Sequence, residues 1–222
     1  MRKFFKKITN PILKTIFKWY YYKPRTYKFE GIKILVHPEV FPPHFTFSTK
    51  ILLNFLKTIE IKGKTFLELG CGNGIISLYA SKKGANVTAS DINETALDYL
   101  KNSAKTNQLE IEILYSDLFE NLINRTFDYI IINPPYYPKK PKNIKELAWF
   151  CGSDFEYFEN LFSQLQNQLI TNSNCFLILS EDCNIEKINS IAKNNKCNLI
   201  LIETHKNWLE TNYIFKVEKL TF

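Results

Sequence analysis

The chain has 222 residues with 45% hydrophobic and 15% aromatic residues, which excludes an intrinsically disordered chain and suits one domain with a sizeable core. Its net charge of +7 is uneven, because residues 1–29 hold nine basic side chains and the first acidic residue is Glu30. The remainder holds 29 − 9 = 20 basic against 22 acidic residues. We therefore predict a basic arm over 1–30 and a nearly neutral domain over 31–222, which disfavours a broad nucleic-acid-binding face.

The cysteines and histidines point to no metal site. Five cysteines and three histidines form no C-x-x-C pair and no mixed cluster. Unpaired thiols suit a reducing compartment, so the sequence predicts a cytoplasmic location. No apolar run approaches the roughly 20 residues that a membrane-spanning helix requires.

In chain order, residues 1–22 come first and are amphipathic, with apolar residues on one side of a helical wheel and lysines on the other. Asn10-Pro11 predicts two short helices or a break there, because proline suits the first helical position after an Asn cap. Two interpretations stay open. The basic arm, residues 1–28, contacts an anionic membrane surface or RNA, or it packs its apolar side on the domain.

Two short strands, 27–29 and 32–36, are predicted next, and a proline-rich loop follows them. An apolar helix is expected over Ile51–Ile59, with Ser48 as its N-cap.

A glycine-rich turn then connects a strand predicted over 65–69 to a helix that starts at Ile75. Glycines at alternate positions let the backbone pass close beneath a ligand. A dinucleotide-binding fingerprint would have its third glycine where Ile75 stands, so a nicotinamide cofactor is disfavoured. The residues of interest here are Glu68, Gly70, Cys71, Gly72 and Gly74.

Acidic residues end the next two predicted strands. Asp91 follows the strand 85–90 and lies 21 positions after Gly70, a spacing at which an acid reaches the ribose hydroxyls of a nucleoside cofactor. Asp91 is also a candidate cap for the helix that runs to about Lys105. A third strand, 110–115, leads to Asp117.

The strand predicted over 127–132 is apolar and ends abruptly at Asn133-Pro134-Pro135-Tyr136. The prolines stop the strand, because they fix φ and remove two N–H donors. Such a turn at the carboxyl end of a central strand is where open α/β sheets place ligands. The Asn133 side chain and the Pro134 carbonyl offer two acceptors, and Tyr136 offers a flat face. This combination suits a planar NH2 group in an amide or a base amine.

Together these motifs resemble class I S-adenosylmethionine-dependent methyltransferases with an N-P-P-Y motif, in particular the HemK-like release-factor glutamine methyltransferases. The resemblance covers about residues 31–220. It implies an α/β, Rossmann-like fold with a doubly wound, mostly parallel seven-stranded sheet and an antiparallel last strand. Gly152 and Asp154 match a Gly-x-Asp element that starts a helix in this family. The closing strands, 198–203 and 213–217, suit an antiparallel hairpin.

The resemblance also implies roles for single residues, with S-adenosyl-L-methionine as the cofactor. Catalytic roles follow for Asn133 and Pro134, which would hold the target nitrogen, and for Tyr136, which would stack on the target plane. A proline-containing loop that ends at Thr49 would cover the cofactor, although this sequence lacks the acidic residue usual beside that Thr. The cofactor-binding residues implied are Thr49, Glu68, Gly70, Cys71, Gly72, Gly74, Asp91, Ile92, Asp117, Leu118 and Asn133.

We therefore expect an N-methyltransferase that acts on a planar amide or amino nitrogen, most simply a protein glutamine side chain. An adenine-N6 or guanine-N2 amine in RNA is the alternative within enzymes. A non-catalytic protein that binds S-adenosylmethionine is the alternative outside them. No metal is expected.

Overall fold

The computed structural model describes residues 22–44, 46–170 and 173–220. The amphipathic segment predicted over 1–22 lies almost wholly outside these residues, so its helices and its contact with membrane or RNA stay predictions. No helix in the described ranges is long and apolar enough to cross a membrane.

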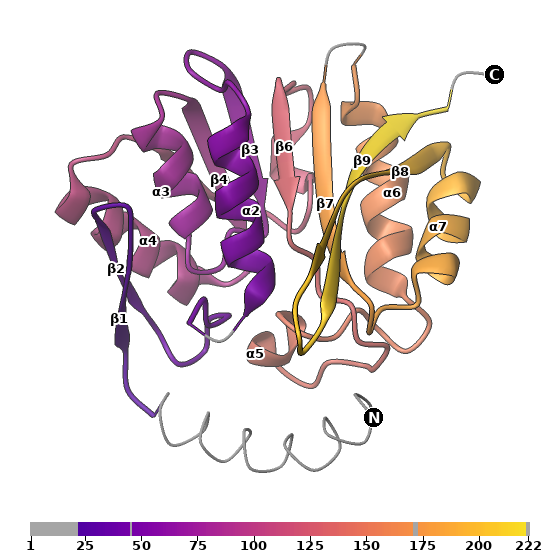
Figure 1. The fold of residues 1–222 in the computed structure, drawn as a ribbon, viewed down its shortest axis with the longest axis horizontal. Helices are drawn as coiled ribbons and strands as arrows, with labels where there is room; N and C mark the ends of the chain where they lie inside the picture. Colours follow the sequence, from indigo (N-terminus) through magenta and orange to yellow (C-terminus); the bar gives the residue numbers. More distant parts are fainter. Residues whose placement is uncertain (1–21, 45, 171–172, 221–222) are drawn as a thin grey trace.

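A seven-stranded sheet forms the centre of the domain, with the strand order β5-β4-β3-β6-β7-β9-β8 (Figure 1). All neighbours pair in parallel except those of the last strand, β9, which runs antiparallel to both β7 and β8. This confirms the expected doubly wound sheet with an antiparallel last strand. The strands are β3 Thr65–Leu69, β4 Asn86–Asp91, β5 Glu112–Tyr115, β6 Tyr129–Ile132, β7 Asn174–Ser180, β8 Cys197–Lys206 and β9 Thr211–Lys219.

Helices cover both faces of the sheet, because successive strand residues point to opposite sides and both sides are apolar. In β6, Ile131 packs into one core cluster, whereas Ile130 and Ile132 pack into the other. One face is covered by α2 Phe47–Thr58, α3 Ile75–Lys82 and α4 Glu94–Asn107, and the other by α6 Glu156–Gln168 and α7 Ile185–Asn194. A short α5, Ile144–Leu147, and a 3-10 turn, Glu120–Leu122, were not expected from the sequence.

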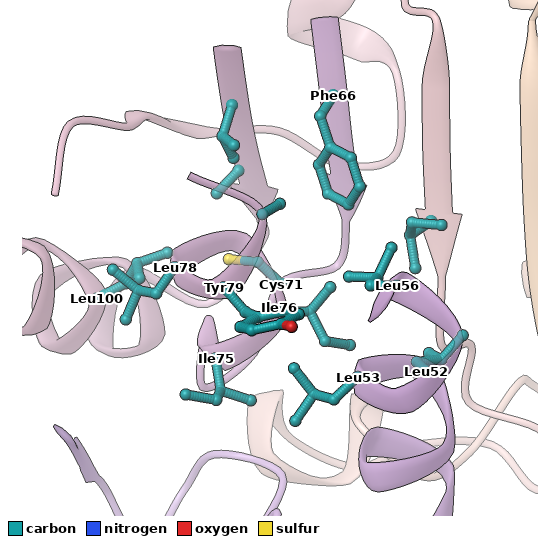
Figure 2. Close-up of a cluster of buried hydrophobic side chains, with 14 of the residues drawn as sticks. Leu52, Leu53, Leu56, Phe66, Cys71, Ile75, Ile76, Leu78, Tyr79 and Leu100 are labelled. Carbon is teal, nitrogen blue, oxygen red and sulfur yellow. The ribbon is translucent and has the colours of Figure 1, made fainter. Parts of the chain in front are cut away.

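The core on the α2–α4 face is continuous. Figure 2 shows leucines of α2 beside Phe66 of β3 and the first turns of α3, with Leu100 of α4 near Leu78. All five cysteines of the chain are buried and none forms a disulfide. Burial raises the pKa of their thiols, to about 11 in Cys151 and Cys197 and to about 12 in Cys183.

A separate hairpin, β1 Arg25–Phe29 and β2 Ile32–Val36, precedes the sheet and packs on α4. The Asn107 side chain ties the two elements together. It accepts from the Lys33 amide at 2.9 Å and donates to the Lys33 carbonyl at 2.7 Å. The expected domain boundary between residues 30 and 31 falls in the turn of this hairpin, and the two-part division itself stays a prediction.

Three helix starts differ from the sequence predictions. Ser48 is not a cap, because α2 already begins at Phe47 after Thr46 and no side chain caps it. Asp91 ends β4 instead of capping α4, and the Asn93 side chain accepts from the Thr95 and Ala96 amides. Each error is a shift of two residues between neighbouring polar side chains that are all plausible caps.

The third difference is at α6. The helix begins at Glu156, after Phe155 in the left-handed conformation (φ 66°). Asp154 caps nothing. Its amide donates to the Glu156 carboxylate at 2.9 Å. Gly152 (φ 91°) is nevertheless essential to this turn, because a Cβ there would lie 1.9 Å from a Glu156 carboxylate oxygen.

Candidate active site

A cavity of about 400 Å³ opens at the carboxyl ends of β3, β4 and β6, where open α/β sheets bind ligands. The loops after β2 and β5 and residues 140–160 complete its wall. Gly74, Pro134 and Tyr136 lie outside the lining. The predicted site residues that line it are Thr49, Glu68, Gly70, Cys71, Gly72, Asp91, Ile92, Asp117, Leu118 and Asn133.

The glycine turn is fastened to the neighbouring strand. The amides of Gly70 and Cys71 both donate to the Ser90 carbonyl at 2.9 Å. Gly70 (φ 72°) has no atom within 4 Å of where a Cβ would stand, so a ligand can approach the backbone there. Gly74 (φ 69°) serves packing instead, since its Cβ would lie 2.3 Å from a methyl carbon of Leu100.

Glu68 is a buried carboxyl in the cavity wall. The Ser77 amide donates to its Oε2 at 2.8 Å, and the Ser77 hydroxyl donates to the same oxygen. Burial raises the pKa of Glu68 to about 8 despite these hydrogen bonds, and the charge of Asp91 adds to the increase. Oε2 thus holds the start of α3, while the residue itself borders the cavity.

Asp91 links the glycine turn to the start of α4. Its Oδ2 accepts from the Gly72 amide at 2.7 Å and its Oδ1 from the Asn93 amide at 2.9 Å. Burial raises the pKa of Asp91, although these backbone hydrogen bonds oppose the increase. Because each carboxylate oxygen has two lone pairs, both can still accept from a ligand in the cavity.

Asp117 and Leu118 follow β5 in a strained turn. Leu118 has φ 48°, and its carbonyl accepts from the buried Ser116 hydroxyl at 2.8 Å. The Asp117 side chain is exposed to the cavity. With Ile92 after β4, this turn provides an apolar wall flanked by carboxylates, which suits a flat heterocycle that carries an amino group.

Asn133 ends β6 inside the cavity lining. Among the described residues, neither its side-chain amide nor the Pro134 carbonyl has a hydrogen-bond partner. Tyr136 packs against the core of the α6–α7 face, with its ring centroid 4.8 Å from that of Tyr137. Burial raises the pKa of Tyr136 far above its usual value, so its hydroxyl stays neutral.

Two loops that are far apart in the sequence meet over the cavity. Phe41, after β2, contacts Trp149 with ring centroids 4.7 Å apart. The Phe41 carbonyl accepts from the Asn73 side chain at 3.2 Å, and the Trp149 carbonyl accepts from the Tyr137 amide at 3.1 Å. These contacts join the glycine turn to the segment just after Asn-Pro-Pro-Tyr. Thr49 lies buried beneath, with its hydroxyl 3.4 Å from that of Thr46.

Sequence reasoning missed several residues of this wall, among them Phe41, Phe150 and Tyr157. Aromatic residues in loops carry no periodic signal, so only the fold shows which of them line the cavity. Lys140 also lines it, as the basic loop after Tyr136 suggested. In the described part of the chain, no group of three His, Cys, Asp or Glu side chains is placed to hold a metal ion.

The cavity fits an elongated nucleoside ligand with an amino-acid tail. A bare backbone at Gly70, acceptors at Asp91 and Asp117, and apolar walls at Ile92 and Leu118 match the parts of S-adenosylmethionine in turn. The roles of the individual residues stay proposals.

Comparison with known proteins decides the family. Residues 31–151, more than half of the chain, match the family model described as Methyltransferase small domain. The protein belongs to this family. It is an S-adenosylmethionine-dependent methyltransferase, which confirms the expected enzyme class and cofactor and sets aside the non-catalytic alternative.

Its relatives act on different substrates. A Methanocaldococcus jannaschii protein, provisionally named a protein N5-glutamine methyltransferase, is 41% identical over 146 residues, which cover 63% of this methyltransferase and 72% of the relative. Ribosomal RNA small subunit methyltransferase C of Haemophilus influenzae is 36% identical over 119 residues, which cover 51% of this chain but only 35% of that longer protein.

The fold is shared with solved methyltransferases. The structure of the T. thermophilus 16S rRNA N2 G1207 methyltransferase, in complex with AdoMet and guanosine, superposes with a TM-score of 0.64 at 19% identity. The match covers 89% of this methyltransferase and 50% of that chain. At this identity the likeness supports the Rossmann-like fold and leaves the substrate open.

Proposed function

We propose that this methyltransferase acts on a planar amide nitrogen, and that its substrate is a glutamine side chain in a protein. One observation carries the proposal: Asn133 lines the cavity with its amide unpartnered among the described residues, directly before the equally unpartnered carbonyl of Pro134. The 41% identity to a protein provisionally named a protein N5-glutamine methyltransferase supports a glutamine over other amides.

The chemistry follows from these two acceptors. When bound, the donor supplies an electrophilic methyl group on a sulfonium sulfur. An amide nitrogen is a poor nucleophile because its lone pair is delocalised into the carbonyl. Asn133 Oδ1 and the Pro134 carbonyl oxygen accept its two hydrogens and so direct the lone pair toward the cavity. No strong base is required, because the nitrogen becomes acidic as the new N–C bond forms and its proton passes to water.

A second candidate substrate is the exocyclic amine of guanine or adenine in RNA. The likeness to ribosomal RNA methyltransferases favours it, as do the exposed side chains of Lys140 and Lys142 at the cavity rim. The same pair of acceptors would orient such an amine equally well, so Asn133 alone does not discriminate between the two substrates.

The decisive experiment supplies methyl-labelled donor and an extract of cells that lack this gene, and then separates protein from RNA. We expect label in protein, reduced about 10²–10³-fold by Asn133→Ala, which is the usual loss when one transition-state hydrogen bond is removed. Donor affinity should change less than twofold. Asn102→Ala serves as the control, since this exposed side chain of α4 lies outside the cavity lining. Label in RNA would contradict the glutamine proposal and support the second candidate.

A further inference from the structure

Tyr157 is a polar residue of the cavity wall that no motif pointed to. It lies in the first turn of α6, where its amide donates to the Cys151 carbonyl at 3.0 Å. Its ring packs edge-on against Phe158, with centroids 5.4 Å apart at 89°. These contacts fix the ring, and its side chain borders the cavity.

The Tyr157 hydroxyl lies within electrostatic reach of two carboxylates from different strand ends. Burial is the main cause that raises the pKa of Tyr157, and the charges of Asp91 and Asp117 raise it further. Asp91 ends β4, and Asp117 follows β5. The hydroxyl therefore remains protonated at neutral pH and is available as a hydrogen-bond donor.

No described residue accepts this hydrogen bond. The carboxylates of Asp91 and Asp117 can only accept, so they suit the ribose hydroxyls and the amino group of a nucleoside. A nucleoside also carries acceptors, namely ring nitrogens and ribose oxygens. The wall formed by Asp91 and Asp117 lacks a side-chain donor for them, and Tyr157 supplies one.

We propose that the Tyr157 hydroxyl donates a hydrogen bond to an acceptor atom of the donor's nucleoside, a ring nitrogen or a ribose oxygen. Tyr157 then fixes the nucleoside between the two carboxylates and contributes to affinity for the adenosine part. The inference goes beyond the proposed function and does not depend on it, because it holds whether the methylated group belongs to a protein or to RNA.

The test is binding, measured by titration calorimetry with two ligands. S-adenosylhomocysteine carries the whole donor skeleton, and methylthioadenosine keeps the nucleoside but lacks the amino-acid tail. We expect Tyr157→Phe to weaken both about tenfold, which corresponds to 1.4 kcal/mol, the upper range for one hydrogen bond. Tyr129→Phe is the matched control. It removes a hydroxyl that donates to the Glu60 carbonyl at 3.1 Å, outside the cavity lining, so both affinities should stay unchanged.

Two results would overturn the inference. Unchanged affinity of Tyr157→Phe for both ligands would show that the hydroxyl makes no contact with them. Weaker binding of S-adenosylhomocysteine alone would place the contact at the amino-acid tail. Melting temperatures, recorded without ligand, set an assay temperature at which every variant is fully folded, so that a small loss of stability cannot imitate weaker binding.

Discussion

The two halves of the active site are built differently. In the donor half, Gly72, Asp91 and Ser77 with Glu68 are bonded to one another or to adjacent backbone, at distances near 2.8 Å. In the acceptor half, Asn133 and Pro134 have no partner among the described residues. The donor half thus belongs to the folded framework, whereas the acceptor half keeps its polar groups open for a substrate. Substitutions should affect folding in the first half and catalysis in the second.

The largest effect is expected at Gly74. Gly74→Ala combines a left-handed backbone with a Cβ placed 2.3 Å from Leu100, so we expect a loss of about 2–4 kcal/mol in the free energy of unfolding. Urea denaturation measures it. Gly63→Ala is the control, because Gly63 has φ 71° with nothing within 4 Å of its Cβ and should lose only about 1 kcal/mol. Equal losses in both variants would contradict the packing role of Gly74.

The next effect concerns pH and Glu68. The pKa of Glu68 is raised from 4.5 to about 8 in the folded protein, so the folded state binds more protons than the unfolded state between these values. Stability should therefore fall as pH rises from about 5 to 8, by up to about 1.4 kcal/mol per pH unit from this group.

Glu68→Gln should reduce this slope while it keeps an acceptor for Ser77, and denaturation midpoints across pH 5–9 would show the difference. Part of the slope should remain, because burial also raises the pKa of Asp91. If the slopes of wild type and variant coincide, Glu68 is ionised throughout and the electrostatic account of the donor half is wrong.

The smallest effect should come from the lysines of the acceptor half. Lys140 and Lys142 are exposed, whereas Lys139 lies over the Phe150 ring at 4.3 Å and is better left intact. For a protein substrate, replacing Lys140 and Lys142 by Gln should lower kcat/KM less than threefold at any ionic strength. For an RNA substrate, the same change should flatten the salt dependence of binding by up to about two contacts.

The sequence predicted the donor half well, because Glu68, the glycine turn and Asp91 are local signals at strand ends. The same is true of Asn133 and the prolines beside it. The contact of Phe41 with Trp149 could not be predicted, since the fold alone brings these distant loops together. Phe155 contradicts local propensity outright, because a bulky residue rarely adopts positive φ. Its conformation sets the start of α6 and hence the place of Tyr157.

The five buried cysteines have a practical consequence. A thiol reacts with a disulfide reagent as thiolate, and the raised pKa values leave very little thiolate in the native state. Modification must therefore wait until part of the chain opens. Because Cys71 lies in the glycine turn and Cys197 begins the edge strand β8, the order in which these thiols become labelled reports which end of the sheet opens first.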